Sequence, residues 1–164
     1  MFRGQQLSKE QALQKLRHYC SYQDRSHQEV KEKLYSFNLR KQEVEESISQ
    51  LIEENYLNEE RFAIQFAGGK FRIKHWGRIK IAQALKQRRV SDYCIRRALE
   101  EIEEEPYLQL LRKLAEKKWN TLKKEGNRFI RLQKTRSYLV QKGFEPRLID
   151  VVLKPLGNGE DNQG

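Results

Sequence analysis

Cysteine, proline and glycine are scarce in this chain of 164 residues, which has two, three and nine of them respectively. The two cysteines, Cys20 and Cys94, lie far apart and form no CxxC motif, so we expect reduced thiols in a cytosolic protein. An all-β sandwich needs a turn signal every ~8–12 residues. The small number of prolines and glycines therefore argues against that fold class.

Long apolar segments are missing too. No run approaches the ~18 apolar residues of a membrane-spanning helix. Residues 1–11 also lack the apolar centre of a signal peptide. We therefore expect a soluble protein in the cytoplasm.

Signatures of catalysis and of metal or nucleotide binding are absent as well. The three histidines form no HExxH motif, no cysteine pair accompanies them, and no GxxxxGK[ST] loop occurs. Cys20 and His18 are two residues apart, and side chains at that spacing on a helix point in different directions. The sequence thus predicts no enzymatic activity, no metal and no cofactor.

Acidic residues are nearly absent from the middle of the chain. Residues 61–97 hold 11 Lys and Arg but one acidic residue, Asp92, so their net charge of +10 equals that of the whole chain. Residues 1–60 and 98–164 carry −2 and +2. Ordinary solvated helices mix both signs of charge, because oppositely charged pairs are mildly stabilising. The unbalanced charge points to an external polyanion: nucleic-acid phosphates first, an acidic protein surface second.

The basic side chains of this segment are the candidate binding residues, and their expected role is to neutralise charge without reading bases. If about six of them reach phosphates, log K should fall with log salt at a slope near −5. The candidates are Lys70, Arg72, Lys74, Arg78, Lys80, Lys86, Arg88, Arg89, Arg96 and Arg97.

Aromatic residues near these cations have two possible roles. Trp76 would stack on a base or pack between helices, and its position at a helix junction favours packing. We expect the remaining aromatic residues of interest to lie in the core or serve the structure: Phe62, Phe66, Tyr93, Trp119 and Tyr138.

An internal repeat organises the apolar residues. Three stretches align without gaps at offsets of 51 and then 54 residues. A period of this length fits three short helices per copy. The aligned apolar sets are Leu34, Leu85 and Leu139; Leu39, Val90 and Phe144; Val44, Ile95 and Ile149; and Ile48, Leu99 and Leu153.

The repeat predicts an elongated all-α molecule of three tandem three-helix repeats, each similar to a helix-turn-helix unit. We place the repeats at residues 8–56, 57–105 and 106–154, with the basic residues in the second. Residues 155–164 are expected to form a disordered tail.

Capping signals place most helix ends. Ser8 with Gln11 and Ser26 with Glu29 form capping boxes. Single caps, breaks and a C′ glycine mark further boundaries, at Asn58, Gly77, Ser91 and Gly143. We expect helices over residues 92–105, 107–124, 129–142 and 146–154, and Ile73 on the apolar face of the helix that follows Asn58.

One run of residues resembles a known family. The stretch Asn55-Tyr56-Leu57-Asn58-Glu59-Glu60-Arg61-Phe62-Ala63, followed by Trp76-Gly77-Arg78-Ile79-Lys80-Ile81 and Leu85, resembles the RecX family. Tyr22-Gln23-Asp24-Arg25-Ser26, with Glu29-Val30 and Lys33-Leu34, is similar to a motif of the same family. The resemblance extends from about residue 9 to 154. Arg78 stands where many relatives have proline, and Asn38-Leu39 and Arg89-Val90 replace the family's glycine-containing pair.

The resemblance implies a non-enzymatic regulator of the RecA recombinase. Such proteins are tandem three-helix repeats that bind RecA–DNA filaments, limit filament growth and damp strand exchange, coprotease function and ATP hydrolysis by RecA. The family usually also binds DNA. We accordingly expect a RecA filament and single- or double-stranded DNA as partners, and a monomer.

Two other hypotheses remain open. Three-helix units with a basic middle are also typical of a helix-turn-helix regulator of DNA, which needs base-edge contacts and usually a dimer. A helical-repeat scaffold that binds an acidic protein is the third. A preference for particular DNA sequences would favour the second hypothesis, and failure to bind any nucleic acid would favour the third.

Overall fold

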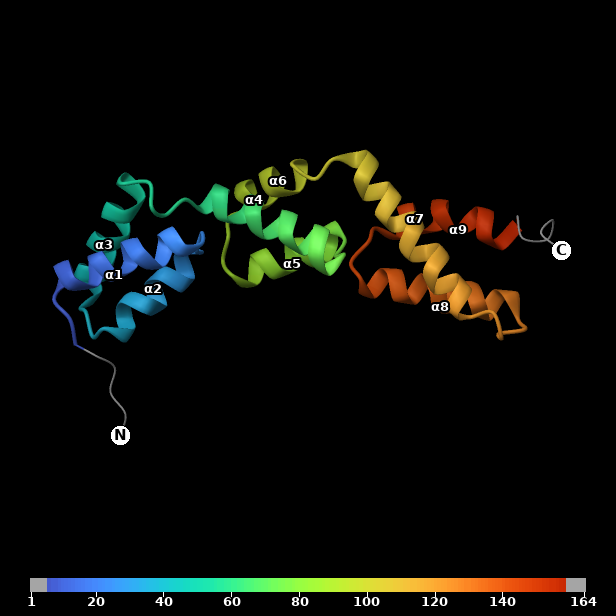
Figure 1. Cartoon of the computed structure of the whole chain (residues 1–164), viewed down its shortest axis with the longest axis horizontal. Helices are drawn as coiled ribbons and strands as arrows, with labels where there is room; N and C mark the ends of the chain where they lie inside the picture. Colours follow the sequence, from blue (N-terminus) through green and yellow to red (C-terminus); the bar gives the residue numbers. More distant parts are fainter. Residues whose placement is uncertain (1–5, 159–164) are drawn as a thin grey trace, which may run out of the picture. The chain divides into compact units, whose positions relative to one another are not determined.

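The structure is a computed structural model that describes residues 6–158. These residues form nine α-helices, one π-helical turn and no strand, which confirms the predicted all-α class (Figure 1). The elements are α1 (Lys9–Tyr22), α2 (His27–Ser36), α3 (Lys41–Glu53), α4 (Glu59–Gly69), η1 (Lys70–Lys74), α5 (Arg78–Gln87), α6 (Asp92–Glu100), α7 (Glu104–Thr121), α8 (Arg128–Gln141) and α9 (Pro146–Asn158).

The predicted capping residues begin the helices. Ser8 and Ser26 each form the complete capping box with the glutamine or glutamate three residues later. The side chain of Asn58 accepts a hydrogen bond from the Arg61 N–H at 2.9 Å. Ser91 does the same for the N–H of Cys94 at 3.3 Å. These bonds satisfy amide groups that have no partner within the helix, which is why short polar residues are favoured there.

The aligned turns of the three repeats share one backbone conformation. Asn38, Arg89 and Gly143 have positive φ values of 62°, 60° and 97°. Each N–H donates to the carbonyl three residues earlier, at 3.0, 2.9 and 2.9 Å. The residue that follows each of them is buried. The left-handed turn therefore forms even where the family's usual glycine is replaced, at a cost of about 1–2 kcal/mol for a residue such as arginine.

The described residues divide into two compact units. The first contains the chain up to Phe66 together with Leu85–Ala98, and the second contains Ala67–Ala84 and the chain from Leu99 onward.

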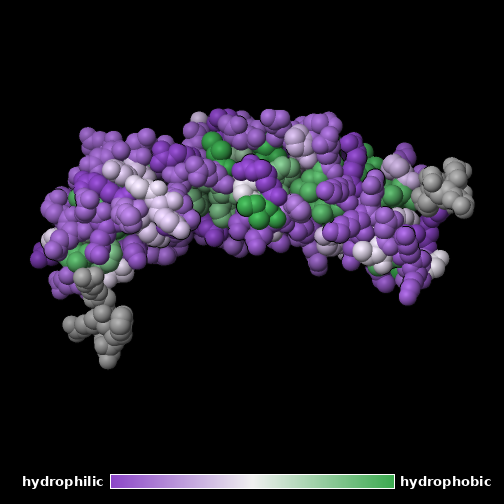
Figure 2. Space-filling model, in the orientation of Figure 1, coloured by the Kyte–Doolittle hydropathy of each residue, from purple (hydrophilic) through white to green (hydrophobic). Residues whose placement is uncertain are grey.

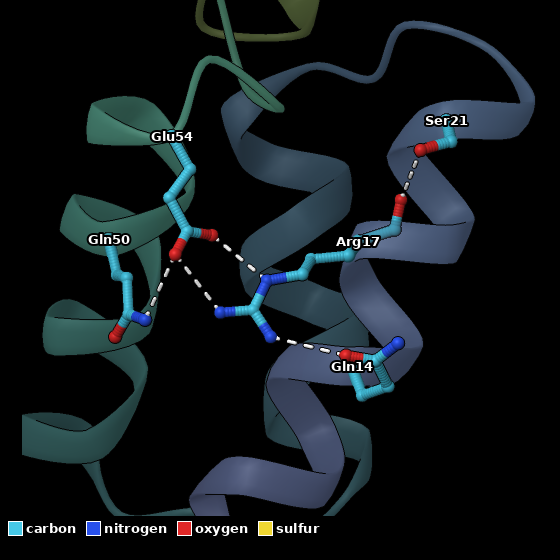
Figure 3. A network of polar contacts seen from close by, with 5 residues as sticks. All are labelled: Gln14, Arg17, Ser21, Gln50 and Glu54. Carbon is cyan, nitrogen blue, oxygen red and sulfur yellow. Dashed lines mark hydrogen bonds and ion pairs between the residues drawn. The ribbon is translucent and has the colours of Figure 1, made fainter.

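In the first unit, α1, α2 and α3 pack on one another around a core of fully buried aliphatic residues. The guanidinium of Arg17 on α1 donates to both carboxylate oxygens of Glu54, at 2.9 and 3.1 Å, and Gln14 and Gln50 complete the network (Figure 3). The core includes Ala12, Leu13, Leu16, Val30, Leu34, Val44, Leu51 and Leu57.

In the second unit, α7 packs against α8 and α9, and α8 packs against α9. Phe71, Tyr107 and Phe144 form a row of rings with centroid separations of 5.9 and 5.3 Å. Trp119 is buried, and the guanidinium of Arg131 lies 3.8 Å from its ring centroid while donating to its carbonyl oxygen. These contacts confirm the structural role predicted for Trp119.

The bounds of α6 and α7 differ from the predictions. Helix α6 ends at Glu100, not at residue 105, because the chain turns at 101–103 and buries Ile102 before α7 begins. Helix α7 ends at Thr121 and not near residue 124. The early start of α7 places Pro106 in its first turn, where a missing N–H costs nothing.

Part of the expected tail is helical. Helix α9 continues through Pro155 to Asn158, beyond the predicted end at residue 154, while residues 159–164 lie outside the described residues. Leu156 is partly buried, and a methyl group added to Gly157 would lie 3.2 Å from the side chain of Leu132 on α8. Packing against α8 therefore extends the helix past a proline that the sequence pattern takes as its end.

Two apolar residues are on the surface instead of in the core. The π-helical turn η1 shifts the helical register, so Phe71 is buried and Ile73 is 76% exposed. Tyr93 is 58% exposed because the buried face of α6 consists of Cys94, Ile95 and Ala98. The predictions for Ile73 and Tyr93 were therefore wrong.

Most of the visible surface is hydrophilic, with apolar side chains in separate patches (Figure 2). In residues 6–158, no helix has both the length and the apolar character that crossing a bilayer requires.

Candidate functional site

The predicted binding residues fall into two groups, one in each compact unit. The second unit contains Lys70, Arg72, Lys74, Trp76, Arg78 and Lys80, and the first unit contains Lys86, Arg88, Arg89, Arg96 and Arg97.

The turn η1 presents the most accessible cations of the second unit. Arg72 and Lys74 are exposed, and neither forms an ion pair with any carboxylate in the described part of the chain. His75 follows in the left-handed conformation with φ 59°, and the Trp76 N–H then donates to the carbonyl of Lys70 at 3.1 Å. The widened turn thus directs two uncompensated positive charges into solvent.

Trp76 is half-buried beside this turn. The Lys70 Nζ lies 5.0 Å and the Lys80 Nζ 4.6 Å from its ring centroid. Both distances are within the range of a cation–π contact. The indole is therefore surrounded by positive charge and is only partly covered by its own unit.

Arg78 has a different environment from its neighbours. Its guanidinium donates to Glu145 at 2.8 Å and to Glu104 at 2.7 Å, and lies 3.7 Å from the ring centroid of Tyr107. Its backbone N–H donates to the Tyr107 hydroxyl at 2.9 Å, and that hydroxyl donates to Glu145. Burial lowers the pKa of Arg78, but hydrogen bonds to Glu145 and Glu104 raise it above its ordinary value.

This arrangement argues against the binding role predicted for Arg78. Two carboxylates already neutralise its charge, and both would have to be released before the guanidinium could bind a phosphate. Its position in the sequence suggested an external partner because Glu104 and Glu145 are 26 and 67 residues away. Arg78 therefore supports the structure at the start of α5.

A close backbone contact joins the start of α5 to the turn after α8. The Gly77 N–H donates to the Lys142 carbonyl at 2.8 Å, and the Ile79 N–H donates to the Gly143 carbonyl at 2.9 Å. A methyl group on Gly77 would lie 2.4 Å from the Gly143 carbonyl carbon, and one on Gly143 would lie 2.3 Å from the Cβ of Lys80. The two glycines are therefore required by the approach of the two backbones.

Lys142 is a cation that the charge pattern missed. Its Nζ donates to the Lys74 carbonyl at 2.8 Å, and burial, together with the nearby positive charge of Lys80, lowers its pKa. Lys142 lies in a segment with nearly balanced charge, so composition gives no sign of its role. The repeat could have found it, because the offset of 54 residues aligns Lys142 with the candidate Arg88.

In the first unit, Arg97 forms an ion pair with Glu60 at 3.2 Å, and Lys86 forms one with Asp92 at 3.5 Å. Both Lys86 and Asp92 are largely exposed, so their pairing is weak. Arg88 and Arg96 lie over aromatic rings, those of Phe66 and Tyr93, at 4.7 and 5.6 Å. Arg89 is exposed on its left-handed turn.

The two cysteines do not have the features of reactive thiols. Cys20 and Cys94 are free and buried, and burial raises the pKa of Cys20 to about 11, so its thiol is protonated at neutral pH. Within residues 6–158, no three His, Cys, Asp or Glu side chains are grouped as a metal site would require.

Comparisons with known proteins agree with the fold and the repeat. A family model described as the second three-helix domain of RecX matches residues 58–99, and one described as the third matches residues 104–153. A crystal structure of RecX from Lactobacillus salivarius superposes with a TM-score of 0.83 at 24% identity, covering 90% of this chain and 96% of that one.

Two curated relatives carry the name regulatory protein RecX. The one from Oceanobacillus iheyensis is 28% identical over 144 residues, which covers 88% of this chain and 53% of that protein. The one from Clostridium perfringens is 31% identical over 137 residues, which covers 83% and 64%. The chain thus matches between half and two thirds of the length of these relatives.

Proposed function

The chain belongs to the RecX family, and from this premise we propose that it is a non-catalytic regulator that binds RecA–DNA filaments and inhibits the recombinase, ATPase and coprotease activities of RecA. The exposed cations of residues 70–97 contact the filament, mainly its phosphates. Arg78 is excluded from this set because its charge is neutralised internally.

One observation carries the proposal. The match to the second RecX domain, over residues 58–99, includes every cation that the charge pattern selects. Arg72 and Lys74 in that range are exposed and have no ion pair within the described residues. Uncompensated charges repel one another, and the negative charges of a phosphate chain relieve that repulsion. Release of the counterions held by the phosphates favours binding further.

The test measures ATP hydrolysis by RecA on single-stranded DNA. The purified chain should reduce hydrolysis at substoichiometric amounts, because an inhibitor that acts on a filament affects many subunits per bound molecule. The variant R72E/K74E should need at least about tenfold more protein for the same inhibition, since it reverses two charges. Unchanged hydrolysis at equimolar protein would overturn the proposal.

A matched control separates specific contacts from net charge. K113E/K117E changes the net charge by the same amount at two exposed lysines of α7. It should inhibit RecA like the unmodified chain. Equal loss of inhibition in both variants would mean that overall charge, not the cations of residues 70–97, determines binding.

DNA binding without RecA is the companion measurement. Binding should be indifferent to sequence, because the expected contacts are to phosphates. A preference of about 1,000-fold or more for particular duplex sites over random duplex, the ratio at which specific DNA binding begins, would contradict the filament proposal and favour a helix-turn-helix regulator.

A further inference from the structure

Lys80, Lys142 and Trp76 lie together in the second unit, although Lys142 is far from the basic segment in sequence. The Lys80 Nζ lies 4.6 Å from the ring centroid of Trp76. Lys142 is held by its bond to the Lys74 carbonyl at 2.8 Å, and the next residue, Gly143, lies against the backbone of Lys80. Two ammonium groups and a half-buried indole thus share one part of the surface.

No acidic residue compensates these two ammonium groups. Within residues 6–158, neither Lys80 nor Lys142 forms an ion pair with a carboxylate. Two like charges held near each other favour an anion between them.

The backbone fixes this pair in place. The bonds from the Gly77 and Ile79 N–H groups to the carbonyls of Lys142 and Gly143 hold the two chain segments together, and Gly143 contacts Lys80 directly. The lysines are therefore brought together before any ligand binds, which reduces the ordering that binding must supply.

We infer that Lys80, Lys142 and Trp76 form a subsite for one nucleotide of single-stranded nucleic acid, in which the two ammonium groups bind a phosphate and the indole stacks on the base. The inference deepens the proposed function by naming the chemistry that this part of the surface recognises. It rests on the proposed function in one respect, which is that nucleic acid is a partner of the chain.

The indole favours a nucleotide over a carboxylate of an acidic protein. A carboxylate needs the ammonium groups alone, whereas a base uses the π-face beside them. A lysine over a partly exposed ring contributes less favourable free energy than a stacked base does. A base can therefore displace Lys80 from the ring. The displaced ammonium group then gains the phosphate as its partner.

Tryptophan fluorescence tests the subsite without RecA, so its failure is distinct from failure of the proposed function. The chain has two tryptophans, and Trp119 is only 4% exposed, so quenching by an oligodeoxythymidylate reports on Trp76. The oligonucleotide should quench part of the emission of the full chain. W76A removes the ring on which a base would stack, so it should lose that quenching and bind at least about fivefold more weakly.

Substitution of the lysines tests the phosphate contact. K80Q and K142Q should each make the slope of log K against log salt shallower, and the double variant K80Q/K142Q should make it shallower by about 0.7, the value expected for the loss of one single-strand phosphate contact. The matched control K117Q, at an exposed lysine of α7, should leave the slope unchanged. K142R keeps the charge and should retain the original slope, which guards against a general effect of substitution at this position.

Three results would overturn the subsite. The first is an unchanged salt slope in both K80Q and K142Q when thermal melting shows that the variants are folded. The second is no change in fluorescence on saturation with the oligonucleotide. The third is polyglutamate binding that equals oligonucleotide binding and weakens equally in K142Q, which would assign the site to an acidic protein surface.

Discussion

Arg72 and Arg78 lie in the same basic stretch, six residues apart, yet the fold treats them in opposite ways. Arg72 is exposed and has no ion pair in the described residues. Arg78 is bound by Glu104 and Glu145 and lies against Tyr107. The difference shows that a run of positive charge does not by itself identify a binding surface, because carboxylates distant in sequence can neutralise part of it.

Between these extremes lie cations whose ion pairs are more exposed to solvent. Arg97 and Glu60 are both about 40% exposed, and Lys86 and Asp92 are both more than 70% exposed. Water screens each pair to a different degree, so burial and the number of partners should rank what each cation contributes to stability.

Gly143→Ala should have the largest effect. The new methyl group would lie 2.3 Å from the Cβ of Lys80, and φ is +97° at this position. Overpacking and left-handed strain together predict a loss of about 3–5 kcal/mol in the free energy of unfolding. Urea denaturation measures it. A loss below about 1 kcal/mol would mean that the contact between residues 77–80 and 142–143 is not tight.

Arg78→Ala should cost about 2–4 kcal/mol. It leaves the partly buried Glu145 and the buried Tyr107 without their cationic partner, and the exposed Glu104 adds little. Arg72→Ala, measured by the same denaturation, should change stability by less than about 0.5 kcal/mol. Equal losses in the two variants would remove the contrast between them.

Arg97→Ala should fall between these values, at about 0.5–1 kcal/mol, because its pair with Glu60 is half-exposed. A double-mutant cycle with Glu60→Ala isolates the pairwise contribution. A coupling energy above about 2 kcal/mol would show that exposure does not rank these pairs.

Arg89→Gly should have the smallest effect and the opposite sign. Arginine is strained at φ 60°, and glycine relieves that strain at some cost in chain entropy. The net result should be a gain of about 0.5–1 kcal/mol, measured as a higher urea midpoint at unchanged m-value. A loss of stability would mean that the arginine side chain makes a contact that outweighs the strain.

Local signals in the sequence were sufficient for much of the fold. Ser8, Ser26, Asn58 and Ser91 mark helix starts through bonds to amides three residues away, so their effect is visible in a short window. The C′ role of Gly143 is equally local. The exposure of Ile73 is not set by a local signal. It follows from the register change at η1, where Phe71 packs against Tyr107, 36 residues later.

The candidate site was less predictable for the same reason. Composition located the basic segment, but Glu104 and Glu145 decide which of its cations are neutralised, and both lie outside it. Lys142 likewise reaches the segment from a region of balanced charge. Such long-range pairings follow from how α7, α8 and residues 77–80 pack, and no local pattern encodes them.

The salt dependence of binding to single-stranded DNA tests the central claim most directly, by comparing Arg72→Gln with Arg78→Gln. Cations without an internal carboxylate partner should carry the binding. Arg72→Gln should therefore make the slope of log K against log salt shallower by about 0.7, while Arg78→Gln, kept folded at low temperature, should leave it unchanged. An equal decrease in both variants, or a decrease in Arg78→Gln alone, would contradict the account.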